Sequence, residues 1–103
     1  MIKKILIAFA IILLVIQFIL PERNIAAAPS KDNIATHYAT PDNVKNILER
    51  SCNDCHSNNT KYPWYASIQP VSAYLENHIK DGKRHLNFDD FLKSIIVFFN
   101  HLL

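Results

Sequence analysis

The 103-residue sequence leaves room for one small domain. It holds eleven Lys and Arg residues against nine Asp and Glu, which gives a formal net charge of +2. Lys3 and Lys4 account for that excess, so residues 21–103 are electrically neutral. A neutral domain lacks the basic patch that binds a polyanion, and nucleic acid is therefore excluded as the expected partner.

The first twenty residues are predicted to form a hydrophobic helix outside that domain. A basic start precedes sixteen residues, 5–20, which only Gln17 interrupts. As a helix this run spans about 24 Å, a little less than the hydrocarbon layer of a membrane. We expect an uncleaved transmembrane signal-anchor over residues 1–20, with the rest of the chain exported. Cleavage near residues 26–28, followed by secretion to the periplasm, is the alternative.

The next segment, residues 21–39, is predicted to be a tether, because it is polar, contains two prolines and lacks an apolar period. A first helix is expected to follow, with Thr40 as its cap and Pro41 in its first turn. Residues 57–69 are predicted to form a long irregular loop.

Two further helices complete the predicted fold. The second helix is expected to begin at Pro70 and to stop at Gly82. Its predicted apolar face has helical spacing and comprises Val71, Tyr74, Leu75, His78 and Ile79. Asn87 is the expected cap of the third helix. Its apolar face is predicted to pack on the core, and an exposed, aggregation-prone face is the alternative if the protein is truncated. The sequence therefore predicts an all-α domain over residues 40–103.

The run from Cys52 to His56 reads C-x-x-C-H, the attachment signature of c-type haem. Two thiols three residues apart project from nearly one face of a helical turn, so both can reach the vinyl groups of one porphyrin. His56 then lies under the ring, where its imidazole can bind the iron. Covalent attachment also suits a domain that is too small to bury a haem deeply.

Two other uses of the cysteines remain open on the residues alone. Cys52 and Cys55 can form a structural or catalytic disulfide in an exported protein, although no strand pattern of a thioredoxin-like fold precedes them. A zinc ion needs four ligands, and the two cysteines with two histidines can supply them.

The stretch Cys-Asn-Asp-Cys-His-Ser-Asn-Asn-Thr-Lys-Tyr-Pro-Trp-Tyr at 52–65 resembles the core of a bacterial haem-binding domain family. This family consists of small, often membrane-anchored, cytochrome-c-like proteins, and the resemblance covers about residues 40–90. It implies a small cytochrome-c-like helical domain with a long haem loop. It also implies that Cys52 and Cys55 attach the haem and that His56 ligates the iron.

The sequence departs from that family near its C-terminal end. Members continue into another helix and a Gly-Glu-Met-Pro-like segment, whose methionine is the expected sixth iron ligand. This sequence contains only Met1, and residues 94–103 are more apolar than the family's polar helix. We therefore expect a domain that is truncated or frame-shifted after about residue 92, with its sixth ligand undetermined.

Two histidines are candidates for the sixth ligand. His78 lies on the predicted apolar face of the second helix, where a lone histidine is more often a core residue than a ligand. His85 follows the turn expected at Gly82, and a solvated loop position is its alternative role.

The remaining candidates surround the haem. Tyr62, Trp64 and Tyr65 can wall it, with their polar atoms bonded to the propionates, although ordinary core packing gives the same pattern. Lys83 and Arg84 can pair with the propionates or lie on a solvated turn.

The expected function is one-electron transfer by one covalent haem c, in an electron carrier rather than an enzyme. The expected location is the periplasmic face of the inner membrane, with periplasmic or membrane-bound redox proteins as partners. A five-coordinate iron that binds a gas or peroxide, in a sensor or weak peroxidase, is the second hypothesis. The third is a thiol-disulfide oxidoreductase that uses the two cysteines without haem.

Overall fold

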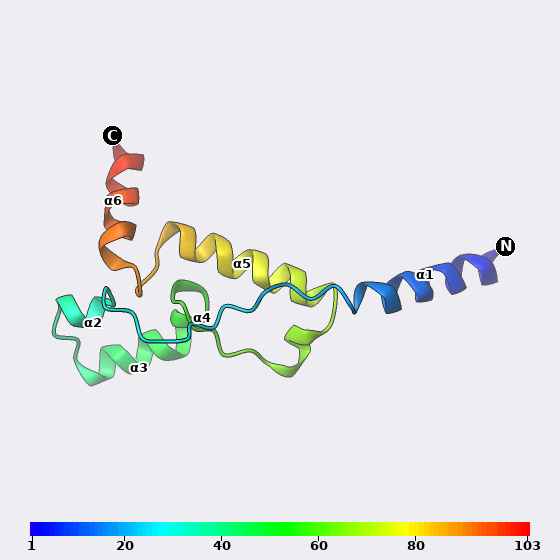
Figure 1. Cartoon of the computed structure of the whole chain (residues 1–103), viewed down its shortest axis with the longest axis horizontal. Coiled ribbons are helices and arrows are strands. Elements are labelled where there is room, and N and C mark those ends of the chain that lie inside the picture. Colours follow the sequence, from blue (N-terminus) through cyan, green and yellow to red (C-terminus); the bar gives the residue numbers. More distant parts are fainter.

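The computed structural model describes all 103 residues and confirms the all-α prediction, because it contains helices and no β-sheet (Figure 1). The molecule is elongated, with principal extents of 63 × 34 × 23 Å. In chain order, its helices are α1 (Ile2–Ile16), α2 (Ile34–His37), α3 (Asp42–Ser51), α4 (Asn53–His56), the 3₁₀ helix η1 (Trp64–Ser67), α5 (Val71–His85) and α6 (Phe91–Leu102).

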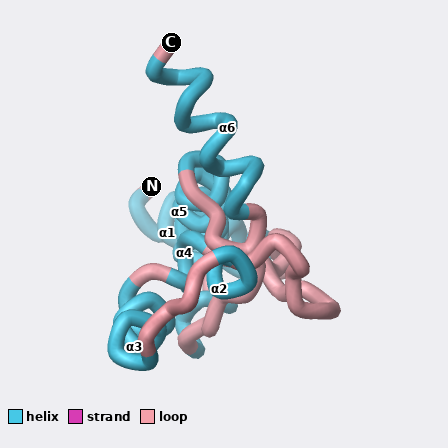
Figure 2. The backbone as a smooth tube through the Cα atoms, turned by 90° about the vertical axis from the view of Figure 1, so that its left-hand side faces the viewer, coloured by secondary structure: helices cyan, strands magenta, loops and turns pink.

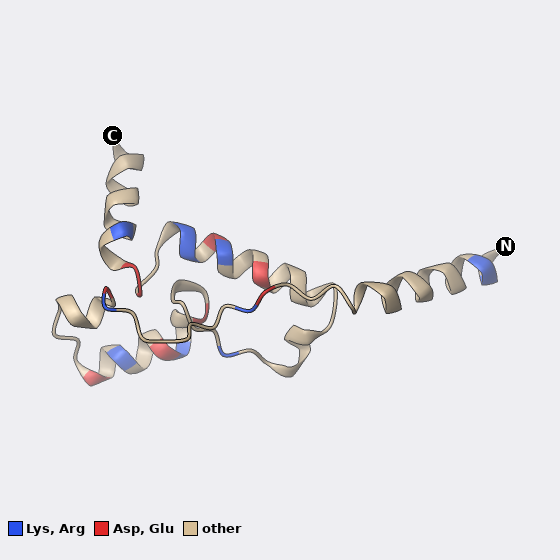
Figure 3. Cartoon of the chain, in the orientation of Figure 1, with Lys and Arg blue, Asp and Glu red and all other residues tan.

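Helix α1 extends away from the other helices, and its only charges lie at its first turn (Figures 1 and 3). It has 15 residues and ends at Ile16, before the predicted end of the anchor at residue 20. The helices of this structure are all too short or too polar to cross a membrane. The predicted transmembrane helix over residues 1–20 is therefore not found.

The end of α1 has a physical cause in the side chain of Gln17. Its amide Nε2 donates to the carbonyl of Gln69 at 3.1 Å, and its Oε1 accepts from the Gln69 backbone N–H at 2.9 Å. The Gln69 side chain in turn donates to the carbonyl of Ile19 at 2.5 Å. These bonds join the C-terminal end of α1 to the residues just before α5.

Residues 21–39 lie along the helical domain rather than forming a free tether. Asn24 is the centre of this attachment. Its side chain donates to the carbonyl of Ser57 and to Oγ1 of Thr60, both at 2.9 Å, and accepts from Nζ of Lys83 at 2.6 Å. The Thr60 backbone N–H donates to the Asn24 carbonyl at 3.0 Å. Polar side chains of this segment, such as Asn24 and Asn33, bond to the domain, and hydrophobic periodicity does not reveal bonds of this kind.

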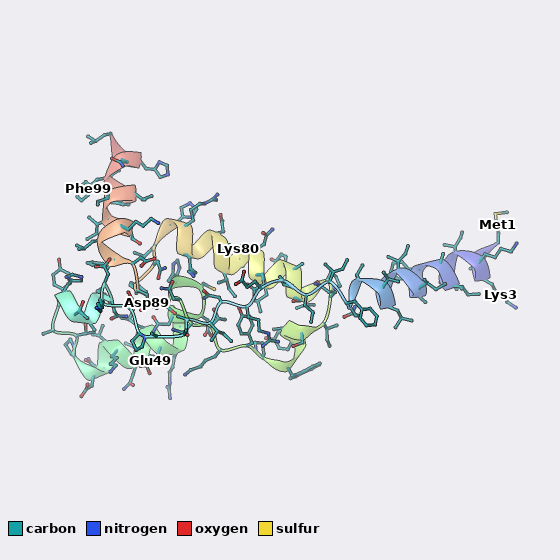
Figure 4. All side chains as sticks on the ribbon, in the orientation of Figure 1. Met1, Lys3, Glu49, Lys80, Asp89 and Phe99 are labelled. Atoms are coloured by element: carbon teal, nitrogen blue, oxygen red, sulfur yellow. The ribbon has the colours of Figure 1, made fainter.

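The buried carboxylate of Asp89 ties three segments together at the other end of the domain (Figure 4). Its Oδ1 accepts from Nδ2 of Asn33 at 2.7 Å, and its Oδ2 accepts from the backbone N–H of Asn58 at 2.8 Å. Its backbone carbonyl accepts from the Ser30 hydroxyl. The segment before α2, the loop after α4 and the segment before α6 therefore meet at one acidic residue.

Helix α3 begins at Asp42 and places the next turn, α4, directly after Cys52. Thr40 does not cap α3 as predicted, because its hydroxyl donates to the carbonyl of Tyr38 at 3.2 Å and Pro41 occupies the cap position. The two helices are contiguous, so the polar helix α3 holds the short α4 in place against α5.

Helix α5 continues through Gly82 to His85, so the predicted stop at this glycine is wrong. Gly82 instead lies where α5 crosses α4. A Cβ on Gly82 would stand 2.7 Å from the carbonyl oxygen of Cys55 and 3.3 Å from its Cβ. The glycine therefore allows close helix contact, and its helix-breaking tendency of about 1 kcal/mol does not decide the local structure.

The buried face of α5 also differs from the predicted one. Ser72, Glu76 and Ile79 are buried, whereas Val71 and Tyr74 from the predicted apolar face are exposed. Ala66 and Ile79 are the only apolar residues in the chain that are fully buried. The interior is therefore held largely by hydrogen bonds between polar side chains and backbone, which hydrophobic spacing does not reveal.

Helix α6 protrudes from the domain beyond its first turn (Figures 1 and 2). Asp90, rather than the predicted Asn87, is at its cap position. Ser94 is buried and its Oγ accepts from the backbone N–H of Asn87 at 2.8 Å. Phe99 and the following residues are exposed, so the predicted packing of this apolar tail on the core is wrong. Contact with the domain is made near the start of α6, where Ser94 bonds to Asn87 and the ring of Phe91 lies edge-on to Tyr38, with centroids 5.7 Å apart.

Gly82→Ala should destabilise the protein by about 1–3 kcal/mol, because the added methyl group overlaps the Cys55 carbonyl. Urea unfolding measures this loss as a lower midpoint. Asn77→Ala, at an exposed position of the same helix, is the control and should be neutral or slightly stabilising. Equal stabilities for Gly82→Ala and Asn77→Ala would contradict the close contact between α4 and α5.

Candidate functional site

Cys52 and Cys55 lie at either end of a single helical turn. The backbone N–H groups of Cys55 and His56 both donate to the carbonyl of Cys52, at 3.2 and 3.0 Å. Both thiols are free and half-buried. The turn contacts α3 and α5, which hold the backbone of both cysteines in place.

His56 is oriented by backbone contacts from the segment after α5. Its Nδ1 lies 2.8 Å from the carbonyl oxygen of Leu86, which can only accept, so Nδ1 carries the proton. The backbone N–H of Phe88 donates to the His56 carbonyl at 2.8 Å, and the two rings lie 6.2 Å apart. This arrangement leaves Nε2 with its lone pair free, as in most histidines that bind a metal.

A pocket of about 490 Å³ opens beside Cys55. This volume falls in the range of cofactor sites in proteins. Its walls come from α4, the following loop and α5, and they consist of Asp54, Cys55, Thr60, Lys61, Tyr62, Pro63, Tyr65, Leu75 and Ile79. The pocket thus brings together Cys55, Tyr62 and Tyr65 of the predicted haem-contacting residues, whereas Cys52 and the predicted iron ligand His56 do not line it.

Trp64 does not line this pocket. Its side chain is 80% exposed and packs edge-on against the ring of Tyr65, with centroids 5.7 Å apart. The loop therefore turns one tyrosine on each side of Trp64 toward the pocket and leaves the tryptophan outside.

The two candidate sixth ligands lie on the exposed side of α5. The His78 ring stacks on Tyr74 at 4.6 Å, and the Nδ1–H of His85 donates to the Asp81 carbonyl at 2.8 Å. Neither histidine lines the pocket beside Cys55, and His56 does not line it either. The structure contains no cluster of three or more His, Cys, Asp or Glu side chains that would hold a metal ion, so the four ligands of the zinc alternative are not assembled.

Tyr62 is surrounded by residues that the sequence did not identify. Its hydroxyl accepts from the backbone N–H of Asn24 at 2.7 Å, and the guanidinium of Arg23 lies 4.6 Å from the centre of its ring. Burial raises the pKa of Tyr62 above its ordinary value, and the neighbouring Glu76 carboxylate adds to the shift, while the Asn24 N–H opposes it. Little in the sequence indicates that Arg23 and Asn24 contact Tyr62, because they lie in a segment that has no helical or strand-like spacing of apolar residues.

These donors fit a haem. Two free thiols on one turn can form thioether bonds to the two vinyl groups, and an imidazole held through Nδ1 can present Nε2 to iron. The pocket adds aromatic and aliphatic walls next to one of the thiols. Cys52, Cys55 and His56 are therefore the residues that would hold the group.

Comparison with known protein families gives one match. The family model described as a haem-binding domain matches residues 11–96, which is most of the chain. The match includes Asn24 and its partners as well as α4. No curated protein and no solved structure matches the chain.

Tyr62 should make the stability of the protein depend on pH in the alkaline range. Because folding raises the pKa of Tyr62 above 10.0, the unfolded chain ionises first, and stability is lost as the pH rises through this value. Tyr62→Phe should reduce this pH dependence, measured by urea unfolding at several pH values. Tyr74→Phe replaces an exposed tyrosine and should behave like the wild type. A Tyr62→Phe profile that matches that of the wild type would contradict the predicted shift.

Proposed function

Since the chain belongs to the haem-binding domain family, we propose that it is a c-type cytochrome with one covalently bound haem. In this proposal Cys52 and Cys55 form the thioether bonds and His56 is the proximal iron ligand. The observation that carries it is the position of His56 one residue after the second thiol, with Nδ1 bonded to the Leu86 carbonyl at 2.8 Å. An imidazole with its protonated nitrogen bonded to a carbonyl and its other nitrogen free is the arrangement typical of a metal ligand.

The small apolar core supports the same proposal. Half of the residues are hydrophobic, yet Ala66 and Ile79 are the only apolar residues that are fully buried. Tyr65, Val71 and Tyr74 are large side chains near the loop and α5 that remain exposed. A haem held at α4 would bury apolar area on both of its faces, at about 25 cal/mol for each Å² removed from water.

We propose one-electron transfer as the function of the haem. A haem iron supplies a reversible change between the ferrous and ferric states. The chain's contribution is to hold the imidazole, exclude water with Tyr62 and Tyr65, and leave an accessible haem edge for redox partners. Periplasmic or membrane-bound redox proteins are the proposed partners.

The proposed location of the protein is inferred from its N-terminal segment. A basic start followed by an apolar run is typical of an export signal, and the apolar residues of α1 are exposed on all sides. We propose that this segment directs the chain to the periplasmic side of the inner membrane and keeps it at that membrane. Attachment of a c-type haem after export agrees with this route.

One observation favours a second function. His78 and His85 lie on the exposed side of α5, and the sequence holds no methionine other than Met1. An iron with His56 as its only protein ligand would have an open position for a gas or peroxide. The protein would then be a haem sensor or a weak peroxidase.

Covalent haem is the first prediction of this proposal. Expression with a c-type maturation system should give a pyridine haemochrome spectrum with saturated vinyl groups, and acid-acetone should not extract the haem. Cys52→Ser with Cys55→Ser should abolish covalent attachment, and His56→Ala should greatly reduce the haem content. His37→Ala is the control, since His37 lies on α2 in contact with Asp32. Extractable haem in the wild type would sink the cytochrome proposal.

His78→Ala and His85→Ala should leave the ferric absorption spectrum unchanged, because both side chains are exposed and contact residues of their own helix, Tyr74 and Asp81. Absorption and electron paramagnetic resonance spectra report the spin state. A high-spin wild type would favour the sensor or peroxidase function, whereas a low-spin wild type would favour electron transfer. Loss of a low-spin signal in either variant would identify that histidine as the sixth ligand and contradict this prediction.

A further inference from the structure

The imidazole and backbone of His56 are held by the two peptide groups on either side of Asn87, and the following inference rests on the proposed haem function. Residues 86–90 join α5 to α6 (Figure 1). The Leu86 carbonyl accepts from Nδ1 of His56, and the Phe88 N–H donates to the His56 carbonyl, both at 2.8 Å. The orientation of these two peptide groups therefore sets the orientation of the candidate iron ligand.

The opposite ends of the same two peptide groups are bonded to one hydroxyl. Both peptide bonds of Asn87 are trans, and in a trans peptide the N–H and the carbonyl point in opposite directions. The Asn87 N–H, opposite the Leu86 carbonyl, donates to Oγ of Ser94 at 2.8 Å. The Asn87 carbonyl, opposite the Phe88 N–H, accepts from the same Oγ at 3.2 Å. One side chain of α6 thus restrains both peptide groups that hold His56.

These bonds are shielded from water, and the side chain of Asn87 reinforces them. Ser94 and Asn87 are both buried, so water does not compete for their polar atoms. Nδ2 of Asn87 donates to Oδ1 of Asn58 at 2.8 Å, and Asn58 follows His56 by two residues. Rotation of the Leu86 carbonyl away from His56 would break the bond between the Asn87 N–H and Ser94.

We propose that Ser94 is a positioning residue for the proximal iron ligand. Its hydroxyl fixes the Leu86 carbonyl, and this carbonyl binds the Nδ1 proton of His56. An imidazole bonded in this way is a more basic ligand. Because a more basic ligand favours ferric over ferrous iron, Ser94 lowers the reduction potential of the proposed haem.

The first test needs no haem. In the full-length chain, NMR of isotope-labelled histidine side chains measures how fast the Nδ1 proton of His56 exchanges with water. Ser94→Ala removes only the hydroxyl and should speed this exchange about threefold or more, because the carbonyl that binds the proton is released. Ser94→Thr keeps a hydroxyl and should exchange like the wild type. Fast exchange in Ser94→Thr, as in Ser94→Ala, would contradict a role for the hydroxyl.

The second test is the reduction potential of the haem-loaded, full-length protein. Ser94→Ala should raise the potential, with the ferrous-to-ferric ratio at a fixed electrode potential rising about threefold. Ser94→Thr should restore the wild-type ratio. Ser72→Ala is the control, since it removes another buried serine hydroxyl, from α5, that makes no bond to residues 86–88. It should leave both the proton exchange and the potential unchanged.

Pyridine haemochrome spectra count the covalent haem in every variant. Wild-type exchange and a wild-type potential in fully loaded Ser94→Ala protein would overturn the role of Ser94 and leave the cytochrome proposal intact. Equal changes in Ser94→Ala and Ser72→Ala would overturn it as well, because they would show a general loosening of the fold. A wild type without covalent haem would overturn the cytochrome proposal and with it the effect on the potential, while exchange of the Nδ1 proton tests the contact between Ser94 and His56 separately.

Discussion

The close approach of α4 to α5 is the constraint on which the site depends. It exists because Gly82 presents only hydrogen to the Cys55 carbonyl. The same approach brings the segment after α5 to His56, where Leu86 and Phe88 bond to its ring and backbone. Any side chain at Gly82 would separate the helices and move the imidazole away from the carbonyl that orients it. A single missing methyl group thus sets both the packing of α4 and the geometry of the candidate iron ligand.

Much of the helical pattern could be predicted from the sequence, because helix starts depend on local chemistry. Pro70 stands just before α5, and the all-α class followed from helical spacing with no strand pattern. The order of Cys52, Cys55 and His56 also indicated the haem-binding family that the comparison with family models shows. These features involve residues that are close in the chain, where spacing alone carries the information.

The errors came from contacts between residues that are distant in the chain. Gly82 looks like a helix stop until the carbonyl of Cys55 lies beside it. The apolar face of α5 was assigned by hydrophobic spacing, but Glu76 is buried next to Tyr62 while Tyr74 is exposed. Arg23 and Asn24 looked like part of a tether, since nothing local shows that they bond to a loop more than thirty residues away. An interior built from polar residues produces no regular spacing of hydrophobic residues in the sequence.

The attachment of Asn24 has a consequence for maturation. A peptidase that cut near residues 26–28 would remove this side chain together with its bonds to Ser57, Thr60 and Lys83. The product would lose both the anchor of the haem loop and the Arg23 guanidinium over Tyr62. Such a cut and the native attachment of residues 21–39 would therefore exclude each other. In the proposed exported protein, attachment of residue 24 to the domain would be possible only in copies that keep the N-terminal segment.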